Sequence, residues 1–451
     1  VKSVDLNLGL RALLSRELDI TSMTLSGVRM NVLRDTTGRT NLELHLHGGL
    51  LKLGRVGAVA VTNAEIVVAG FDAHTGRVTP LLTVSGVNAS LRPIDLTAPD
   101  PTKQIDATAV LRGARITTPF LAAPVQFAAG TVFIKDRAVR GTFAAALGPM
   151  RMTGTVAIAG LEPLSAIMFD VAVPELDVAA MKRLVIRGAG GDLAVAPDRR
   201  LLARGMITLD RVVLSPLEAT GARGRVSVYT NEIQVAPYAL SAYGGTIRGT
   251  ASLHYTAASL PVVATTTVRG LNVARAVSAL SAGDARLTGS LDADLRLATD
   301  AGGDPEGALT GAGTFALRDG SFPRLELKGA MVKIATAVRL ITVPAGPTRF
   351  SYLGGDVRIA HERVYSNAIR LDGDGLEGTV RGSFGFDQTL DYLGTGALNT
   401  PPSAASKGVL SAVGRLLRKV VPGTSGAAGK QVAFSVRGTF DDPKFSRGGG
   451  R

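Results

Sequence analysis

The stretch GSLDADLRLATDAGGDPEGALTGAGTFALRDGSFPRLELKG, residues 289–329, alternates apolar and charged positions on either side of glycine-rich turns. In its first run the apolar positions share one parity and the charged ones the other: Leu291, Ala293, Leu295 and Leu297 against Asp292, Asp294 and Arg296. A period of two places successive side chains on opposite faces of a β-strand. This stretch therefore predicts strands with one apolar and one hydrated face.

The same alternation continues along most of the chain, with breaks at Gly, Asp-Gly, Asn or Pro. The 54 glycines and 21 prolines among 451 residues fit a chain that turns often. A short motif recurs at irregular spacing, as VRGTF at Val139, MTGTV at Met152, IRGTA at Ile247, LTGSL at Leu287, VRGSF at Val380 and VRGTF at Val436. We expect its glycines to lie where a strand bends or ends. The fold class that follows is mainly β: a long curved antiparallel sheet with a few short amphipathic helices.

A second repeat predicts two short helices. VPELDVAAMKRL from Val173 and VRGLNVARAVSAL from Val268 share the core L-[DN]-V-A at a separation of 95 residues. Each core indicates a strand that runs into a helix, with Asp177 or Asn272 as the helix cap. Two units of similar design in tandem are the expected arrangement.

Two further amphipathic helices are expected near the C-terminus. Leu327, Met331, Ile334, Val338 and Ile341 recur at helical spacing, and SAASKGVLSAVGRLLRKVVPG from Ser403 does so more strongly. The second helix has an apolar stripe and only basic charges, with these as its membrane-contact candidates: Val409, Val413, Leu416, Leu417, Val420, Arg415, Arg418 and Lys419. It is interpreted either as a cap packed on the sheet or as an interfacial helix on an anionic membrane.

The formal net charge of +13 would attract an anionic surface. The 50 basic residues of the chain are scattered singly, without the clustered basic stripe or the base-stacking aromatic residues typical of nucleic-acid binding proteins. We therefore expect an anionic membrane surface as a partner, and no nucleic acid. The two longest charge-free stretches, from Ile116 and Gly249, contain prolines and many hydroxyl residues and are not expected to span a bilayer. The chain begins within the alternating pattern, so we expect a further segment before Val1.

Motifs that carry chemistry are weak. Of the five histidines only His45 and His47 are close in sequence, and two imidazoles without a third donor make a poor zinc site. The glycines of GAGTFA at Gly311 precede a strand and not a helix, and GTSGAAGKQ at Gly423 departs from the phosphate-loop spacing. No G-x-S-x-G is present. We expect no enzyme, no metal and no cofactor.

Three stretches in order resemble the AsmA family of bacterial envelope proteins. They are the opening VDLNLGLRALLSRELDITSMTLSGVRMNVLRDTTGRTNLELHL, with a turn formed by Arg34, Asp35, Gly38 and Asn41; the run VYSNAIRLDGDGLEGTVRGSFGFDQTLDY; and the terminal VAFSVRGTFDDPKF. GLNVARAVSAL and GTFALRDGSF are similar to the family as well. Leu42 stands where a tryptophan is expected. The resemblance implies an N-terminal inner-membrane anchor before Val1, a periplasmic location and a β-trough with an apolar groove.

The expected organisation is an N-terminal β segment over residues 1–170, a middle β unit with a short helix over 171–265, a β-groove unit over 266–400, and a basic helix with a terminal strand over 401–451. A trough with one apolar face could hold acyl chains, since few helices are available to cover that face. The expected groove-lining residues are Leu291, Leu295, Leu297, Phe315, Leu317, Phe384, Phe386, Val432, Phe434 and Val436.

The leading functional hypothesis is a periplasmic protein that shields or conducts phospholipid acyl chains and supports outer-membrane lipid supply. The alternative is a non-enzymatic scaffold or regulator of outer-membrane protein assembly, with other envelope proteins as partners. The scaffold would fill the groove with its own side chains and would not exchange lipid between vesicles.

Overall fold

The computed structural model is mainly β and describes residues 1–8, 17–35, 41, 52–71, 76, 78–98, 101–119, 121–161, 165–184, 199–255, 259–280, 287–323, 327, 347–373, 376–398, 431–439 and 442–447. These residues contain 25 strands, assigned to one mixed sheet, and two short α-helices. The chain divides into two compact units. Unit 1 is Val1–Leu240 with Thr250–Pro261, and unit 2 is Ser241–Gly249 with Val262–Arg451. The domain boundaries expected from the sequence stay a prediction.

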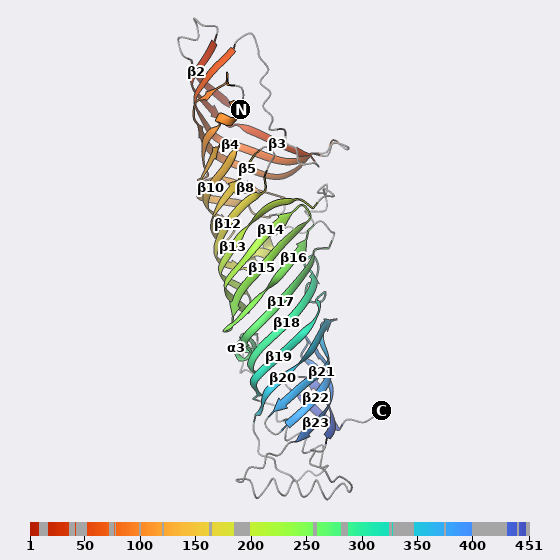
Figure 1. Ribbon diagram of the computed structural model, residues 1–451. Helices are drawn as coiled ribbons and strands as arrows, with labels where there is room; N and C mark the ends of the chain where they lie inside the picture. The colour runs from red at the N-terminus through yellow and green to blue at the C-terminus, as the bar shows by residue number, and fades with distance from the viewer. Residues whose placement is uncertain are drawn as a thin grey trace, which may run out of the picture. The chain divides into compact units, whose positions relative to one another are not determined.

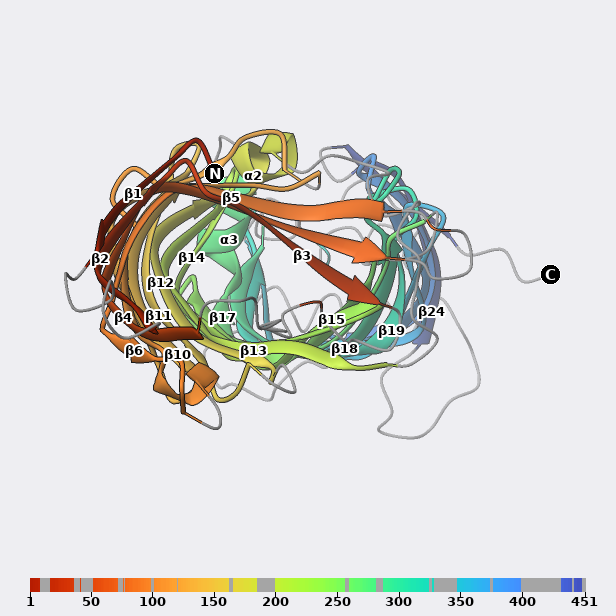
Figure 2. The ribbon, with the colours of Figure 1, turned by 90° about the horizontal axis from the view of Figure 1, so that it is seen from above.

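Unit 1 contains the strands β1 to β14, which have these bounds: β1 Ser3–Leu8, β2 Glu17–Ser26, β3 Arg29–Asp35, β4 Lys52–Phe71, β5 Val78–Leu91, β6 Ile94–Asp95, β7 Asp106–Val110, β8 Arg115–Thr117, β9 Val125–Lys135, β10 Ala138–Leu147, β11 Met150–Ile158, β12 Ile167–Asp177, β13 Leu201–Leu214 and β14 Leu217–Tyr229. A 3-10 turn, η1, spans Pro101–Gln104 and helix α2 spans Val178–Leu184. Strands β10 to β14 lie side by side and follow a curved path (Figures 1 and 2).

Strands β15 Glu232–Ala242, β16 Gly245–His254 and β17 Pro261–Asn272 contribute residues to both units. Unit 2 continues with α3 Val273–Leu280 and then these strands: β18 Thr288–Asp300, β19 Thr310–Phe322, β20 Thr348–Ala360, β21 Arg363–Gly373, β22 Leu376–Gly385, β23 Thr389–Leu398, β24 Gln431–Thr439 and β25 Pro443–Arg447. From β18 to β25 each strand pairs antiparallel with the next. Hairpin-linked strands are what the glycine-rich turns predicted.

The expectation of a purely antiparallel sheet is wrong for unit 1. Strand β4 pairs in parallel with β2 along its first half and with β3 along its second half. Strands β12 and β13 are also parallel, with α2 between them in the chain. A parallel pair needs a crossover connection, and a helix usually supplies it. The helix that the sequence predicted after Asp177 therefore lies in a crossover between two strands that run in the same direction, which the alternation could not show.

Both predicted helix caps are confirmed. The backbone N–H of Ala180 donates to the Asp177 carboxylate at 3.0 Å, and the N–H of Arg275 donates to the side-chain oxygen of Asn272 at the same distance. Each bond satisfies one of the N–H groups left without an intrahelical partner in the first turn. The shared L-[DN]-V-A core therefore marks two strand-to-helix transitions of the same design.

The motif glycines behave in two ways. Gly289, Gly382 and Gly438 have φ of 134°, 153° and 101°, and the pairing register shifts beside Gly289 and opposite Gly382. These glycines confirm the expected bends. Gly141 and Gly154 lie inside the regular pairing of β10 with β11, so the expectation is wrong there. Close packing across the strands explains their place: a Cβ would lie 2.8 Å from Cγ2 of Val132 at Gly141 and 2.9 Å from Cζ of Phe143 at Gly154.

A line of interrupted pairing crosses unit 1. Gly27 lies where β2 meets β3, Asn63 within β4, Gly86 within β5, and Gly113 between β7 and β8. Their φ angles are all positive, at 61°, 51°, 74° and 79° in that order. The pairing of β4 with β5 shifts twice next to Asn63. Left-handed residues at matching levels of neighbouring strands bend the sheet. We call this line the bend.

The bend has its own hydrophobic core. Ala64, Val87, Ala109 and Ala114 are buried there, and Ala114 is 0% exposed. Val61 and Val132 from one side of the line, and Val84 and Phe127 from the other, pack against this cluster. The apolar face thus buries part of itself where the sheet bends.

The N-terminal turn of the resemblance is partly described. The Asn41 side chain accepts a hydrogen bond from the Leu33 N–H at 2.9 Å and donates one to the Asn31 carbonyl at 3.0 Å. Its own N–H donates to the Leu33 carbonyl at 3.2 Å. Asn41 thereby occupies backbone groups of β3, which pairs with β4 alone among the described strands. Gly38 lies outside the described residues.

Candidate functional site

One face of unit 2 is apolar across seven consecutive strands, β18 to β24. The pairing register places one residue from each strand in rows that run across the strands. Three rows are complete: Leu291, Leu317, Leu353, Leu371, Gly378, Gly396 and Val432; Ala293, Phe315, Gly355, Ile369, Val380, Gly394 and Phe434; Leu297, Gly311, Ile359, Val364, Phe384, Leu390 and Gly438. A fourth row contains Leu295, Gly313, Val357, Gly382, Tyr392 and Val436 and is interrupted at a bulge in β21.

These rows contain nine of the ten residues predicted from the sequence as groove-lining: Leu291, Leu295, Leu297, Phe315, Leu317, Phe384, Val432, Phe434 and Val436. Phe386 is the exception, because it follows the end of β22 in a turn, where its side chain is 39% exposed. The register brings residues 145 positions apart onto one face, which alternation within single strands could not establish. Their contact with a lipid stays a prediction.

Helix α3 covers one end of this face. Val273 and Val277 of the helix pack with Leu317 and Phe350, and Leu317 is only 2% exposed. Leu291, Leu353 and Leu371 of the first row lie against this cluster. Leu295, Leu297, Val357 and Ile359 are not part of it and remain half-buried. The face thus has a covered end and an open part, as far as the described residues go.

Unit 1 carries rows of the same kind across eleven strands, β1, β2, β4, β5, β7 and β9 to β14. The first row contains Val4, Leu25, Val61, Ala89, Ala109, Val132, Gly141, Val156, Phe169, Gly205 and Val226. The second contains Leu6, Met23, Val59, Leu91, Ala107, Ile134, Val139, Ile158, Ile167, Ala203 and Val228. At about 4.8 Å per strand, each row spans about 48 Å. The sequence analysis missed these residues, although their alternation could have identified them.

Phenylalanine–glycine pairs recur on the faces that carry the rows. Phe143 faces Gly154, Phe169 faces Gly205, Phe315 faces Gly355 and Phe434 faces Gly394. A Cβ placed on Gly205 would lie 2.4 Å from Cδ2 of Phe169, and one on Gly394 would lie 2.9 Å from Cζ of Phe434. The aromatic ring therefore lies over the glycine of the neighbouring strand, which is a known way to pack a bulky side chain in a sheet.

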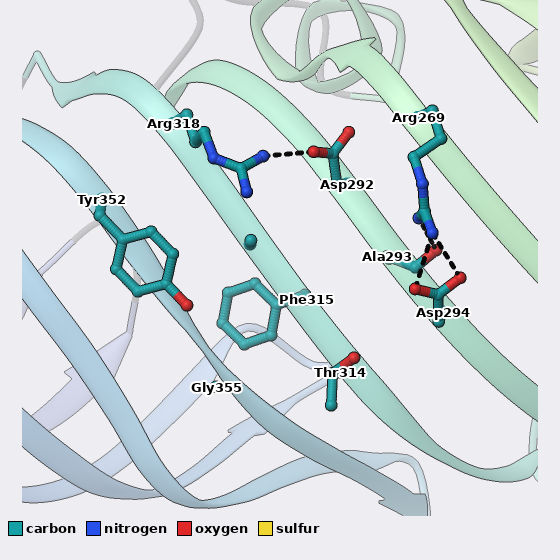
Figure 3. Close-up of a pocket in the computed structure, with 10 residues that line it drawn as sticks. Arg269, Asp292, Ala293, Asp294, Thr314, Phe315, Arg318, Tyr352 and Gly355 are labelled. Carbon is teal, nitrogen blue, oxygen red and sulfur yellow. Dashed lines mark hydrogen bonds and ion pairs between the residues drawn. The ribbon is translucent and has the colours of Figure 1, made fainter.

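The opposite face of unit 2 is polar and carries ion pairs (Figure 3). Arg269 donates two hydrogen bonds of 2.9 Å to the Asp294 carboxylate, and Arg318 pairs with Asp292. The Gly270 N–H also donates to Asp292 at 2.9 Å. The hydrogen bond from the Gly270 N–H is the largest cause that lowers the pKa of Asp292, and Arg318 lowers it further. The hydrogen bonds from Arg269 lower the pKa of Asp294. Both carboxylates are therefore ionised and paired at neutral pH.

A shallow depression of about 430 Å³ lies on this polar face beside Arg318, Thr314 and Tyr352 (Figure 3). The charges of Arg269 and Arg318 balance those of Asp292 and Asp294 there. Among the described residues no three His, Cys, Asp or Glu side chains are grouped closely enough to hold a metal ion. This arrangement stabilises a hydrated sheet face and contains no recognisable catalytic set.

The predicted basic helix, with all of its membrane-contact candidates from Val409 to Val420, lies outside the described residues. The same holds for His45, His47 and the helical stripe after Leu327. In the parts of the chain that are described, neither α-helix has the length and apolar character needed to cross a bilayer.

No protein-family model, curated protein or solved structure matches this chain.

Proposed function

We propose that the protein binds lipid acyl chains on the apolar faces of its sheet, as a membrane-anchored periplasmic protein that shields or conducts phospholipid and supports outer-membrane lipid supply. This proposal includes membership of the AsmA family, a groove formed by the curvature of the sheet, and contact with an anionic membrane. It requires neither a catalytic step nor a cofactor.

The observation that carries the proposal is the set of apolar rows, three of which are complete over seven strands in unit 2. Side chains of Leu297, Ile359 and Phe384 remain half-buried in unit 2, although their row is apolar over seven strands. Burying apolar surface is favourable by roughly 0.8 kcal/mol per methylene group, so a partly exposed apolar row can solvate a hydrocarbon chain. Scattered exposed hydrophobic residues need no explanation, but a continuous apolar surface indicates a binding site.

The opposite face of the same strands is polar, so the two faces of the sheet would bind different classes of ligand. Polar and charged residues alternate with the rows in the same strands, including Arg296, Thr314 and Arg358. A ligand that is wholly polar would find its partners there, whereas a hydrocarbon chain would find them only on the rows. The charge of +13 adds attraction toward anionic lipid surfaces.

Transfer of a fluorescent phospholipid between donor and acceptor vesicles tests the proposal. The double variant Leu297→Gln, Ile359→Gln adds two polar groups to the apolar row on either side of Gly311. The matched control Ala312→Gln, Thr379→Gln adds the same groups to exposed positions on the polar face. We expect transfer at a rate set by wild-type concentration, a severalfold slower rate for the row variant, and no change for the control.

Native mass spectrometry of the wild-type protein purified from membranes provides a second measurement, with co-purifying phospholipid as the expected result. A lipid-free spectrum together with no transfer between vesicles would contradict the proposal and favour the scaffold role. Equal transfer by the folded row variant and its control would show that these rows are not the binding surface.

A further inference from the structure

Tyr392 places a single phenolic hydroxyl on the apolar face of unit 2. In register it faces Gly382 of β22 and Val436 of β24, and Leu390 and Gly394 are its nearest neighbours on the same face of β23. The other two tyrosines of these strands, Tyr352 and Tyr365, belong to the polar face, where the Arg358 guanidinium lies 4.6 Å above the Tyr365 ring. Among the described residues of β18 to β24, Tyr392 is thus the one tyrosine that the apolar rows contain.

The hydroxyl of Tyr392 is partly desolvated and makes no hydrogen bond to any described residue. Burial raises the pKa of this phenol, and the positive charge of Arg363 offsets that rise only in part. The group is therefore neutral at pH 7 and can donate one hydrogen bond. A bound hydrocarbon chain would remove water from this part of the apolar row, and the hydroxyl would then gain from an acceptor carried by the same ligand.

We propose that the Tyr392 hydroxyl donates a hydrogen bond to the carbonyl oxygen of a fatty-acyl ester whose hydrocarbon chain lies on the apolar rows. This inference rests on the proposed lipid binding and adds selectivity for ester-linked over ether-linked chains. The complementarity is chemical: one donor within an apolar surface matches one acceptor at the end of a hydrocarbon chain. Val436 and Leu390 supply the apolar contact on two sides of the donor.

The experiment compares two monomeric probes with the same phosphocholine head group and the same sixteen-carbon chain, hexadecanoyl lysophosphatidylcholine and its hexadecyl ether analogue. Isothermal titration of the full chain below the critical micelle concentration measures both affinities. For the wild type we expect about three- to tenfold tighter binding of the ester, the range that one net hydrogen bond supplies. Tyr392→Phe should remove this preference and leave binding of the ether unchanged.

Tyr365→Phe is the matched control, because it removes the same hydroxyl from the polar face. It should retain the wild-type preference, which excludes a general effect of losing one tyrosine. An equal ester-to-ether ratio in the wild type and in Tyr392→Phe would overturn the role of Tyr392 while lipid binding itself stands. If the wild type binds neither probe, both the selectivity and the proposed lipid binding are contradicted.

Discussion

The bend of unit 1 and the open part of the apolar face of unit 2 are built from the same alternation of apolar and polar residues, yet they bury their apolar side chains differently. We call that open part, with Leu295, Leu297, Val357 and Ile359, the open rows. At the bend, left-handed residues such as Gly86 turn the sheet so that its apolar face packs on itself, and Val87 is 6% exposed. In the open rows Leu297 and Val357 stay half-buried, since no described helix covers them. The alternation creates an amphipathic sheet, and backbone conformation decides whether the apolar face becomes core or stays accessible to a ligand.

The largest expected effect would break the bend. Gly86 has φ of 74°, and a Cβ at this position would lie 3.3 Å from the Gly113 carbonyl oxygen. Gly86→Val should lower the free energy of unfolding of unit 1 by about 2–4 kcal/mol, from backbone strain and crowding together. Urea unfolding followed by circular dichroism measures the loss.

Gly303→Ala is the control for that substitution, because nothing lies within 4 Å of a Cβ there and its φ is not left-handed. It should change the free energy of unfolding by no more than about 0.5 kcal/mol. Equal losses for both variants would show that the left-handed backbone at the bend has no special role.

A smaller effect would sharpen the contrast in burial. Val87→Ala at the bend removes two methyl groups from a buried cluster and should cost about 2 kcal/mol. Val357→Ala removes the same groups from the open row and should cost about 1 kcal/mol or less, since water already reaches that side chain. Chemical denaturation of both variants compares them. A larger loss at Val357 would mean that the open row is as well covered as the bend.

A third prediction concerns the bulge in β21, which a side chain holds in place. The Asp356 carboxylate accepts hydrogen bonds from the N–H groups of Asn367 at 3.3 Å and Ala368 at 3.1 Å. These bonds, the one from Asn367 first, lower the pKa of Asp356. A carboxylate with a lowered pKa stabilises the fold above its unfolded pKa, and that contribution disappears as the pH falls through the folded value.

Asp356→Asn should therefore be less stable than the wild type at pH 7, and the difference should shrink as the pH falls below about 4. Thermal unfolding at a series of pH values measures it. The effect should be modest, because Asp356 is only half-buried and water still screens its charge. A difference that persists unchanged at pH 2 would assign it to geometry and not to ionisation.

The smallest effect is expected at Asn63, the non-glycine residue of the bend. Its φ of 51° lies in the left-handed region that asparagine tolerates, and its N–H donates to the Asn88 side chain at 3.0 Å. Asn63→Gly keeps both features, so unfolding should change by less than about 0.5 kcal/mol. Asn63→Val should instead behave like Gly86→Val in the same denaturation assay. Tolerance of valine at Asn63 would contradict the conformational account of the bend.

Features that depend only on neighbouring residues could be predicted from the amino-acid sequence. Alternation from Leu291 to Leu297 established the strand and its two faces, and Asp177 and Asn272 were correctly identified as helix caps, because a cap bonds to an N–H only three residues away. Nine of the ten proposed lining residues fall on one face, since parity within each strand sets the side to which a residue points. Phe386 lies just past the end of β22, and parity does not reveal where a strand ends.

The pairing partners of the strands, their directions and their registers become visible only in the folded protein. The parallel pairing of β4 with β2 and β3, and of β12 with β13, joins segments far apart in the chain, and alternation is the same for either direction. The bend required Gly27, Asn63, Gly86 and Gly113 to reach matching levels in neighbouring strands, which is a property of the register. Tyr392 became distinctive for the same reason: its apolar neighbours Gly382 and Val436 come from other strands, so its environment exists only once the sheet has formed.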